Sequence, residues 1–303
     1  MKWLLYRVAG WPLPVVAFVG SALGWLAWLL SPTYRRHLLA NATQAGLTPA
    51  QRRQSVAQIG RLFLEVPWLW FRDRSQPVSP LIKRWHGTEL VDAVLAQGRG
   101  LILLTPHLGC FELAGRAYAE RWGSQHPITS LYRPSRQRWL AEVQVTARNA
   151  PGMLTAPASV GGVRQLIRAL RKGETLGMLP DQVPPDGQGV WAAFFGRRAY
   201  TMTLAGRLIQ QTGCAVLLTW CERLPGAQGF ELHYALLPQP ITPEATEEQA
   251  ATAVNAAMEW TIAQCPTQYL WGYNRFKGPR KTEPDPKPAP KPDAPAKAPE
   301  AKP

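Results

Sequence analysis

The chain has 303 residues, 46% of them hydrophobic, and is therefore long enough to bury a sizeable core. Lysine and arginine outnumber aspartate and glutamate by 34 to 20, which gives a formal net charge of +14 at pH 7 and a surface that attracts polyanions. Thirteen tryptophans, including Trp3, Trp11, Trp25 and Trp28 near the start, favour a membrane surface over nucleic acid, because tryptophan concentrates at membrane interfaces. The four scattered cysteines form no CxxC pair and indicate neither a zinc site nor a disulfide framework.

The first 33 residues are strongly apolar. No charged residue stands between Arg7 and Arg35, and Leu13–Leu30 is an apolar run of 18 residues, just long enough to cross a bilayer. A signal peptide would also begin with basic residues, but the bulky residues 25–30 lack a small-residue cleavage site. We therefore expect residues 1–33 to form an uncleaved membrane anchor, which either spans the bilayer or lies in its interface.

Residues 35–75 have the pattern of two helices, separated at Gly46. Thr48 precedes a proline and is expected to cap the second helix. This helix ends in a tryptophan-rich cluster, residues 68–71, that could rest on lipid headgroups.

Apolar runs of strand length then alternate with helical patterns. We predict strands at 101–104, 128–132, 175–180, 215–220 and 231–237, and helices at 89–97, 109–122, 135–149, 160–172, 202–212 and 247–264. A short segment at 191–195, after a glycine-rich loop, is left without an assigned type. This alternation predicts one α/β domain, residues 34–277, with a central mixed, largely parallel sheet flanked by helices. Residues 278–303 are rich in proline, alanine and lysine and are expected to be a disordered tail.

The most informative stretch is Gly100–Leu113, in which a buried strand is followed by a turn and a helix. His107 lies in the turn and Glu112 in the first part of the helix, so the two side chains can converge. An imidazole at the end of a buried strand with a carboxylate nearby is a candidate general base. Alternatively, His107 is a structural residue and Glu112 is there because the helix dipole favours it.

Further polar residues follow other predicted strands. Arg133 comes after the strand at 128–132, and Asp181 and Gln182 come after the strand at 175–180. Because the carboxyl ends of parallel strands meet at one edge of a sheet, we expect these residues to approach His107.

A candidate anion site lies further along the chain. Arg197 and Arg198 precede a predicted helix whose N-cap is Thr201 or Thr203, an arrangement that suits a phosphate, although a solvated turn would look the same. Cys110 could carry a covalent acyl group, but a small buried residue at a helix start is the simpler interpretation.

These motifs together resemble a known family. Gly100–Leu113, Tyr132-Arg133, Leu179-Pro180-Asp181-Gln182, and Phe194-Phe195-Gly196 with Thr201 are similar to the signatures of the bacterial lipid A late acyltransferases, the lauroyl and myristoyl transferases of lipopolysaccharide biosynthesis. The resemblance spans roughly residues 34–276. It departs from the family pattern at Cys110-Phe111, where Asn-Trp is usual.

The resemblance implies a glycerol-3-phosphate-acyltransferase-like fold and transfer of an acyl chain from acyl carrier protein, or from coenzyme A, to a hydroxyl of an anionic glycolipid. It implies His107 as the base, Glu112 as the residue that orients it, and Arg133 as a stabiliser of the oxyanion or of a phosphate. Arg197 and Arg198 would hold phosphates of the acceptor, with Gln182 and Thr201 also at the substrate site and Asp181 organising its edge.

The same resemblance implies no cofactor, no metal, and a location at the inner membrane with the catalytic domain on the cytoplasmic side. Two alternatives stay open. One is a sibling acyltransferase that acts on a phospholipid or an aminolipid, and the other is a non-catalytic membrane protein that binds lipid.

Overall fold

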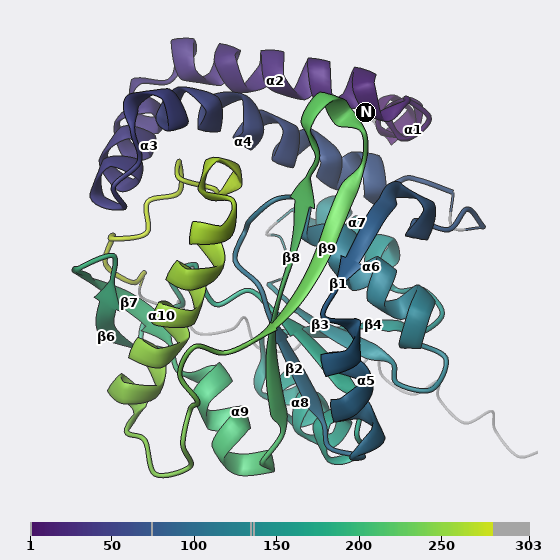
Figure 1. The fold of residues 1–303 in the computed structure, drawn as a ribbon, viewed down its shortest axis with the longest axis vertical. Helices are drawn as coiled ribbons and strands as arrows, with labels where there is room; N and C mark the ends of the chain where they lie inside the picture. Colours follow the sequence, from purple (N-terminus) through teal and green to yellow (C-terminus); the bar gives the residue numbers. More distant parts are fainter. Residues whose placement is uncertain (1, 74, 134, 136, 281–303) are drawn as a thin grey trace, which may run out of the picture.

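The computed structural model describes residues 2–73, 75–133, 135 and 137–280. A seven-stranded sheet in the order β1-β9-β8-β2-β5-β3-β4 forms its centre (Figure 1). The strands are β1 (Ile82–His86), β2 (Leu101–Leu104), β3 (Ile128–Tyr132), β4 (Met153–Pro157), β5 (Thr175–Met178), β8 (Ala215–Arg223) and β9 (Phe230–Leu236). All neighbouring strands of this sheet pair in parallel except β8 and β9, which confirms the mixed, largely parallel α/β sheet.

Helices cover both faces of the sheet. Their bounds are α5 (Thr88–Ala96), α6 (Phe111–Trp122), α7 (Arg138–Arg148), α8 (Val160–Arg171), α9 (Leu204–Thr212) and α10 (Glu247–Gln264), with short 3-10 turns at η1 (Ser79–Leu81), η2 (Pro225–Ala227) and η3 (Pro266–Gln268). The positions of these helices agree with those expected, and α10 coincides with its predicted range.

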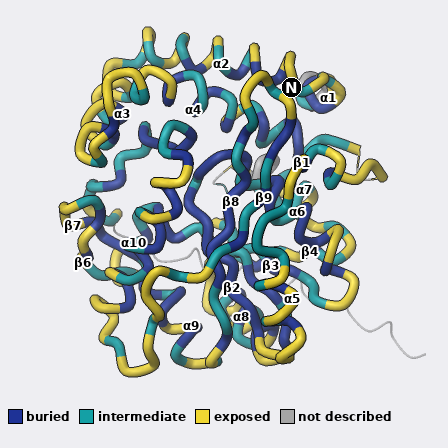
Figure 2. The backbone as a smooth tube through the Cα atoms, viewed as in Figure 1, coloured by how far each residue is buried: buried dark blue, intermediate teal, exposed yellow. Residues whose placement is uncertain are grey.

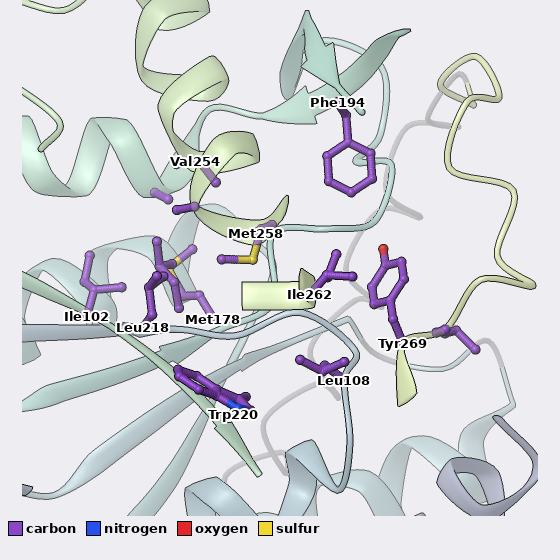
Figure 3. Close-up of a cluster of buried hydrophobic side chains, with 14 of the residues drawn as sticks. Ile102, Leu108, Met178, Phe194, Leu218, Trp220, Val254, Met258, Ile262 and Tyr269 are labelled. Carbon is purple, nitrogen blue, oxygen red and sulfur yellow. The ribbon is translucent and has the colours of Figure 1, made fainter. Parts of the chain in front are cut away.

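The apolar run of β2 is explained by burial on both faces. Leu101 and Leu103 belong to the buried cluster that includes α5 and α6. Ile102 and Leu104 belong to the opposite cluster, which includes α8, α9 and α10 (Figure 3). A central parallel strand needs apolar residues at successive positions because neither of its faces meets water.

An N-terminal helical layer lies over one end of the sheet. It consists of α1 (Lys2–Ala9), α2 (Leu13–Leu30), α3 (Pro32–Gln44) and α4 (Pro49–Trp70), and α2 lies lengthwise along α4 (Figure 1). Thr48 caps α4 as expected, and its side chain accepts a hydrogen bond from the backbone N–H of Gln51 at 3.3 Å. Within the described residues, α2 is the one helix with the length and mean hydropathy (1.9) to cross a membrane, a criterion that core helices and signal sequences also meet.

The tryptophan-rich end of α4 is packed against protein, contrary to the suggestion that it rests on lipid. Trp68 is 1% exposed, and its ring N–H donates to the carbonyl of Trp11 at 3.0 Å. Arg148 lies over the ring of Trp70 at 5.0 Å.

Two edge strands, β1 and β4, and both strands of one hairpin were not predicted as strands. Residues 197–202, expected to be a turn leading into a helix, form β7 (Arg197–Met202), which pairs with β6 (Gly189–Phe194) in a separate two-stranded sheet. The hairpin reverses at Phe195 and Gly196, which have φ values of 46° and 72°. Most of the predicted tail, from residue 281 onward, lies outside the described residues.

Candidate active site

The turn that carries His107 is held by backbone hydrogen bonds to two other segments. The carbonyl of His107 accepts from the N–H of Leu270 at 3.1 Å, and the N–H of Cys110 donates to the carbonyl of Cys221 at 2.8 Å. Gly109 has a φ of 57°, and a Cβ atom there would lie 2.0 Å from the Cys221 carbonyl oxygen. Only glycine fits this position, so the turn has little freedom to move.

Asp181 is the residue that orients the imidazole of His107. It follows β5, the neighbour of β2, and accepts hydrogen bonds from Nδ1 of His107 at 2.8 Å and from the His107 backbone N–H at 3.0 Å. Burial opposes ionisation of Asp181, but the charge of His107 and these hydrogen bonds outweigh it and lower the pKa of the carboxyl. When the ring proton is on Nδ1, Nε2 is unprotonated and can accept a proton, as a general base must.

Gln182 occupies the other side of the ring. Its side-chain amide nitrogen donates to Nε2 of His107 at 3.2 Å. Both residues line the same pocket, so a substrate hydroxyl could take the place of this amide at Nε2.

Glu112 has a different partner from the one expected. Its carboxylate makes a two-point ion pair with Arg148, in which Nε of Arg148 donates at 3.2 Å. Burial disfavours the charged guanidinium, but Glu112 outweighs this effect and raises the pKa of Arg148. Phe111, the first residue of α6, packs its ring 5.0 Å from that of His107. The side chain of Glu112, the next residue, is directed instead toward Arg148 of α7.

The polar residues that follow β2, β3 and β5 do meet at one edge of the sheet. His107, Arg133 and Gln182 line a single pocket of about 760 Å³, and Asp181 is buried behind His107. The largely apolar wall of the pocket includes Leu131, Val160, Val163, Met202, Leu204 and Leu208.

Among the residues that the structure describes, four arginines line this pocket: Arg133, Arg148, Arg164 and Arg207. The first residues of α8 and α9 also line it, so two helix N-termini add partial positive charge. Sequence reasoning missed Arg164 and Arg207. The signal that could have found Arg164 is Ser159, whose hydroxyl accepts from the N–H of Gly162 and thereby caps α8 at the pocket.

Arg197, Arg198 and Thr201 are on β7 and are not among the residues that line the pocket. Arg197 lies over the ring of Phe276 at 4.7 Å, and Arg198 pairs with Glu248 at 3.2 Å.

Thr201 is fully buried, and its hydroxyl accepts from Asn255 at 2.9 Å and from Arg275 at 2.7 Å. Thr201 is therefore not an N-cap, because β7 forms a hairpin strand where a turn before a helix was predicted. Thr203 occupies the N-cap position of α9 but makes no capping hydrogen bond through its side chain.

Cys110 is 2% exposed, and burial raises the pKa of its thiol well above the usual value. A buried, protonated thiol is a poor nucleophile, which favours direct attack over a covalent intermediate.

A group of side chains that sequence reasoning missed lies on β1 and β9. One ligand atom each from His86, Glu231 and His233 lies within 4.8 Å of the others. The two imidazoles are stacked nearly parallel, so their lone pairs do not converge, and Arg84 already pairs with Glu231 at 3.0 Å. The arrangement fits an ion-paired surface better than a metal centre.

The site combines a hydrogen-bonded histidine and carboxylate with a largely apolar pocket at one edge of an α/β sheet, an arrangement that suits acyl transfer. The chain belongs to the bacterial lipid A biosynthesis acyltransferase family, whose model matches residues 3–278. Its relatives include two enzymes of Escherichia coli (strain K12). It is 28% identical to the lipid A biosynthesis lauroyltransferase, over 91% of each chain, and 27% identical to the palmitoleoyltransferase, over 88% of this chain and 86% of that protein.

A phosphatidylinositol mannoside acyltransferase of Mycobacterium tuberculosis (strain CDC 1551 / Oshkosh) is also similar. It is 27% identical over 60% of this chain and 57% of that protein. The similarity therefore extends to an enzyme named for a different lipid.

Proposed function

We propose that the protein transfers a fatty acyl chain from an acyl carrier protein thioester to a hydroxyl of a lipid A precursor, with His107 as the general base. The observation that carries this proposal is the 2.8 Å hydrogen bond between His107 and Asp181 at the edge of the large pocket. The apolar wall of the pocket suits an acyl chain, and its arginines suit the phosphates of an anionic glycolipid.

In the proposed step the acceptor hydroxyl displaces the amide of Gln182 and hydrogen-bonds to Nε2 of His107. Its oxygen forms a bond to the thioester carbonyl carbon as its proton passes to Nε2, and the C–S bond then breaks. The proton moves from the imidazolium to the departing thiolate. Asp181 stabilises the imidazolium, and general-base catalysis of this kind contributes ~10²–10⁴-fold.

Glu112 acts in this proposal through Arg148 and not through His107. The ion pair fixes the guanidinium of Arg148 at the wall of the pocket that His107 also lines. Arg133 is more exposed than Arg148, and its side chain can approach an oxyanion or a phosphate in the pocket. Arg164 has the phosphate-binding role in this proposal that was expected of Arg197 and Arg198. Arg207 also lines the pocket, but its guanidinium is already paired with Glu247 at 2.7 Å.

The proposed acyl donor and the proposed membrane location rest on the net charge of the chain and on the type of reaction. A net charge of +14 favours an acidic carrier protein and an anionic membrane as partners, with coenzyme A as the alternative donor. The reaction needs no cofactor, because the thioester supplies the leaving group. We place the enzyme at the inner membrane with its catalytic domain on the cytoplasmic side, where acyl carrier protein is made.

A sibling activity on a phospholipid or an aminolipid is the second candidate, and the similarity to the mannoside acyltransferase supports it. A non-catalytic lipid-binding role is the third. The oriented imidazole argues against it, because a binder has no use for a base.

The test is acyl transfer by the full chain, with thioesters of several chain lengths and either a Kdo-bearing lipid A precursor or a phospholipid as acceptor. His107→Ala and Asp181→Asn should lose ~10²–10⁴-fold in kcat while staying folded. His126→Ala and Asp186→Asn, which change the same residue types outside the pocket-lining set, are the matched controls.

Transfer to the phospholipid alone would establish the sibling activity. Absence of transfer to every acceptor, or full activity of His107→Ala, would refute the assignment of His107.

A further inference from the structure

The outward side of α2 is a continuous apolar surface. Its exposed side chains include Val15, Phe18, Leu23, Leu26, Leu29 and Leu30, with Phe18 76% and Leu30 73% exposed. Exposed positions recur along the backbone of α2, which lies at the outside of the molecule (Figure 2). The helix contains no charged residue. An exposed apolar surface of this kind marks a contact with a membrane or another protein.

The inward side of α2 is in backbone contact with α4. Gly20 and Gly24 of α2 meet Gly60 of α4, and a Cβ atom on Gly60 would lie 2.1 Å from the carbonyl oxygen of Gly20. A Cβ atom on Gly24 would lie 2.3 Å from the carbonyl oxygen of Val56. The two helices can approach this closely only because glycine occupies these positions.

Side-chain hydrogen bonds fasten α2 near its start and in its middle. Trp68 of α4 donates to the carbonyl of Trp11, just before α2, at 3.0 Å. Arg61 of α4 donates to the hydroxyl of Ser21 at 2.7 Å. The helix is thus attached to α4 over much of its length and does not project from the domain.

α4 is in turn part of the core. Its Glu65 makes a buried two-point ion pair with Arg223 of β8, with both N–O distances 2.7 Å. If α2 crossed a bilayer in this packing, α4 would enter the hydrocarbon beside it together with its charged residues Arg52, Arg53 and Arg61. Charged side chains at that depth are strongly disfavoured.

The charge around α2 matches an anionic surface. Residues 1–70 contain seven basic residues and one acidic residue, Glu65, which is buried. Exposed arginines stand at both ends of α2, Arg7 on α1 and Arg35 and Arg36 on α3, and Arg53 lies 5.8 Å from the ring of Trp25. Arginines that flank an apolar helix face are typical of helices lying in the headgroup region.

We infer that α2 lies in the plane of the membrane, with its outer face in the acyl chains of one anionic leaflet and its inner face on α4, and does not span the bilayer. The choice of the cytoplasmic leaflet rests on the proposed function.

The first test is topology in inverted inner-membrane vesicles. Tyr6→Cys on α1 and Thr33→Cys on α3 introduce exposed thiols on either side of α2, whereas the four native cysteines are buried. A membrane-impermeant maleimide should label both positions at similar rates before detergent is added. Protection of one position alone until detergent is present would show a spanning helix and overturn the inference. Protection of both positions would place α2 on the periplasmic leaflet and overturn the choice of leaflet.

The second test is binding of the purified full chain to vesicles that contain phosphatidylglycerol. Phe18→Glu and Leu26→Glu should each weaken binding about tenfold without changing the unfolding temperature. Leu236→Glu, an exposed leucine on β9, is the matched control.

Unchanged binding of both α2 variants would overturn the membrane contact. Neither readout depends on acyl transfer, so a failure of the proposed function would be seen separately.

Discussion

Asp181 holds His107 at two points, the ring nitrogen Nδ1 at 2.8 Å and the backbone N–H at 3.0 Å. One carboxylate therefore fixes both the orientation of the ring and the position of the turn. Tyr269 is 3% exposed, and burial together with the charge of Asp181 raises the pKa of its hydroxyl well above the usual value. The imidazole is held ready for proton transfer before a substrate arrives.

Asp181 should make stability depend on pH. Its pKa is lowered in the folded protein, so the ionised carboxylate stabilises the fold above the unfolded value of about 3.9, and this contribution is lost as the pH falls through the folded value. Urea unfolding at several pH values should show the advantage of wild type over Asp181→Asn shrinking below about pH 4. A constant difference across this range would contradict the prediction.

The arginines of the pocket should control affinity for a phosphorylated acceptor. A charge-assisted hydrogen bond contributes about 1.5–3 kcal/mol, so Arg133→Ala and Arg164→Ala should each raise KM for the acceptor about tenfold or more. Arg168→Ala, one turn further along α8 and outside the pocket lining, should leave KM unchanged. If Arg197→Ala raised KM instead, the phosphates would bind near the β6–β7 hairpin.

Glu112 and Arg148 should behave as one unit. Removing one member of a buried ion pair costs about 3–5 kcal/mol, whereas removing both costs less than the sum. The measurement is a double-mutant cycle with Glu112→Gln, Arg148→Met and the double variant. Chemical unfolding and kcat of these variants give the coupling free energy between the two side chains. The exposed pair Arg198–Glu248 is the control and should contribute about 0–1 kcal/mol. Strictly additive losses at Glu112 and Arg148 would mean that Glu112 acts elsewhere.

Gly109 should tolerate no side chain. Gly109→Ala combines a positive φ with a clash against the Cys221 carbonyl, so it should destabilise the fold and lower kcat. Gly98→Ala separates the two effects, because Gly98 has a φ of 63° and open space around it, and the left-handed conformation alone costs about 1–2 kcal/mol. Equal unfolding free energies for the two variants would mean that the turn can shift away from β8.

The position of His107 in a turn between a strand and a helix was predictable because it depends on local features: a buried strand, a proline and a helix start. The Asp181 partnership was not, since it depends on β5 lying next to β2 although the two residues are 74 positions apart. Glu112 was misread for the same reason, because its partner Arg148 comes from another helix. The missed strands β1 and β4 are at the sheet edges, where fewer apolar residues are needed and the pattern is weaker.

A single guanidinium group joins the N-terminal helices to the catalytic turn. Arg223 donates to Glu65 of α4 at 2.7 Å and to the carbonyl of Gly109 at 2.8 Å. If α2 lies in the membrane surface as inferred, this connection would set the depth of His107 relative to the lipid headgroups. Under the proposed function, the acceptor hydroxyl would then have to lie at that depth to be acylated.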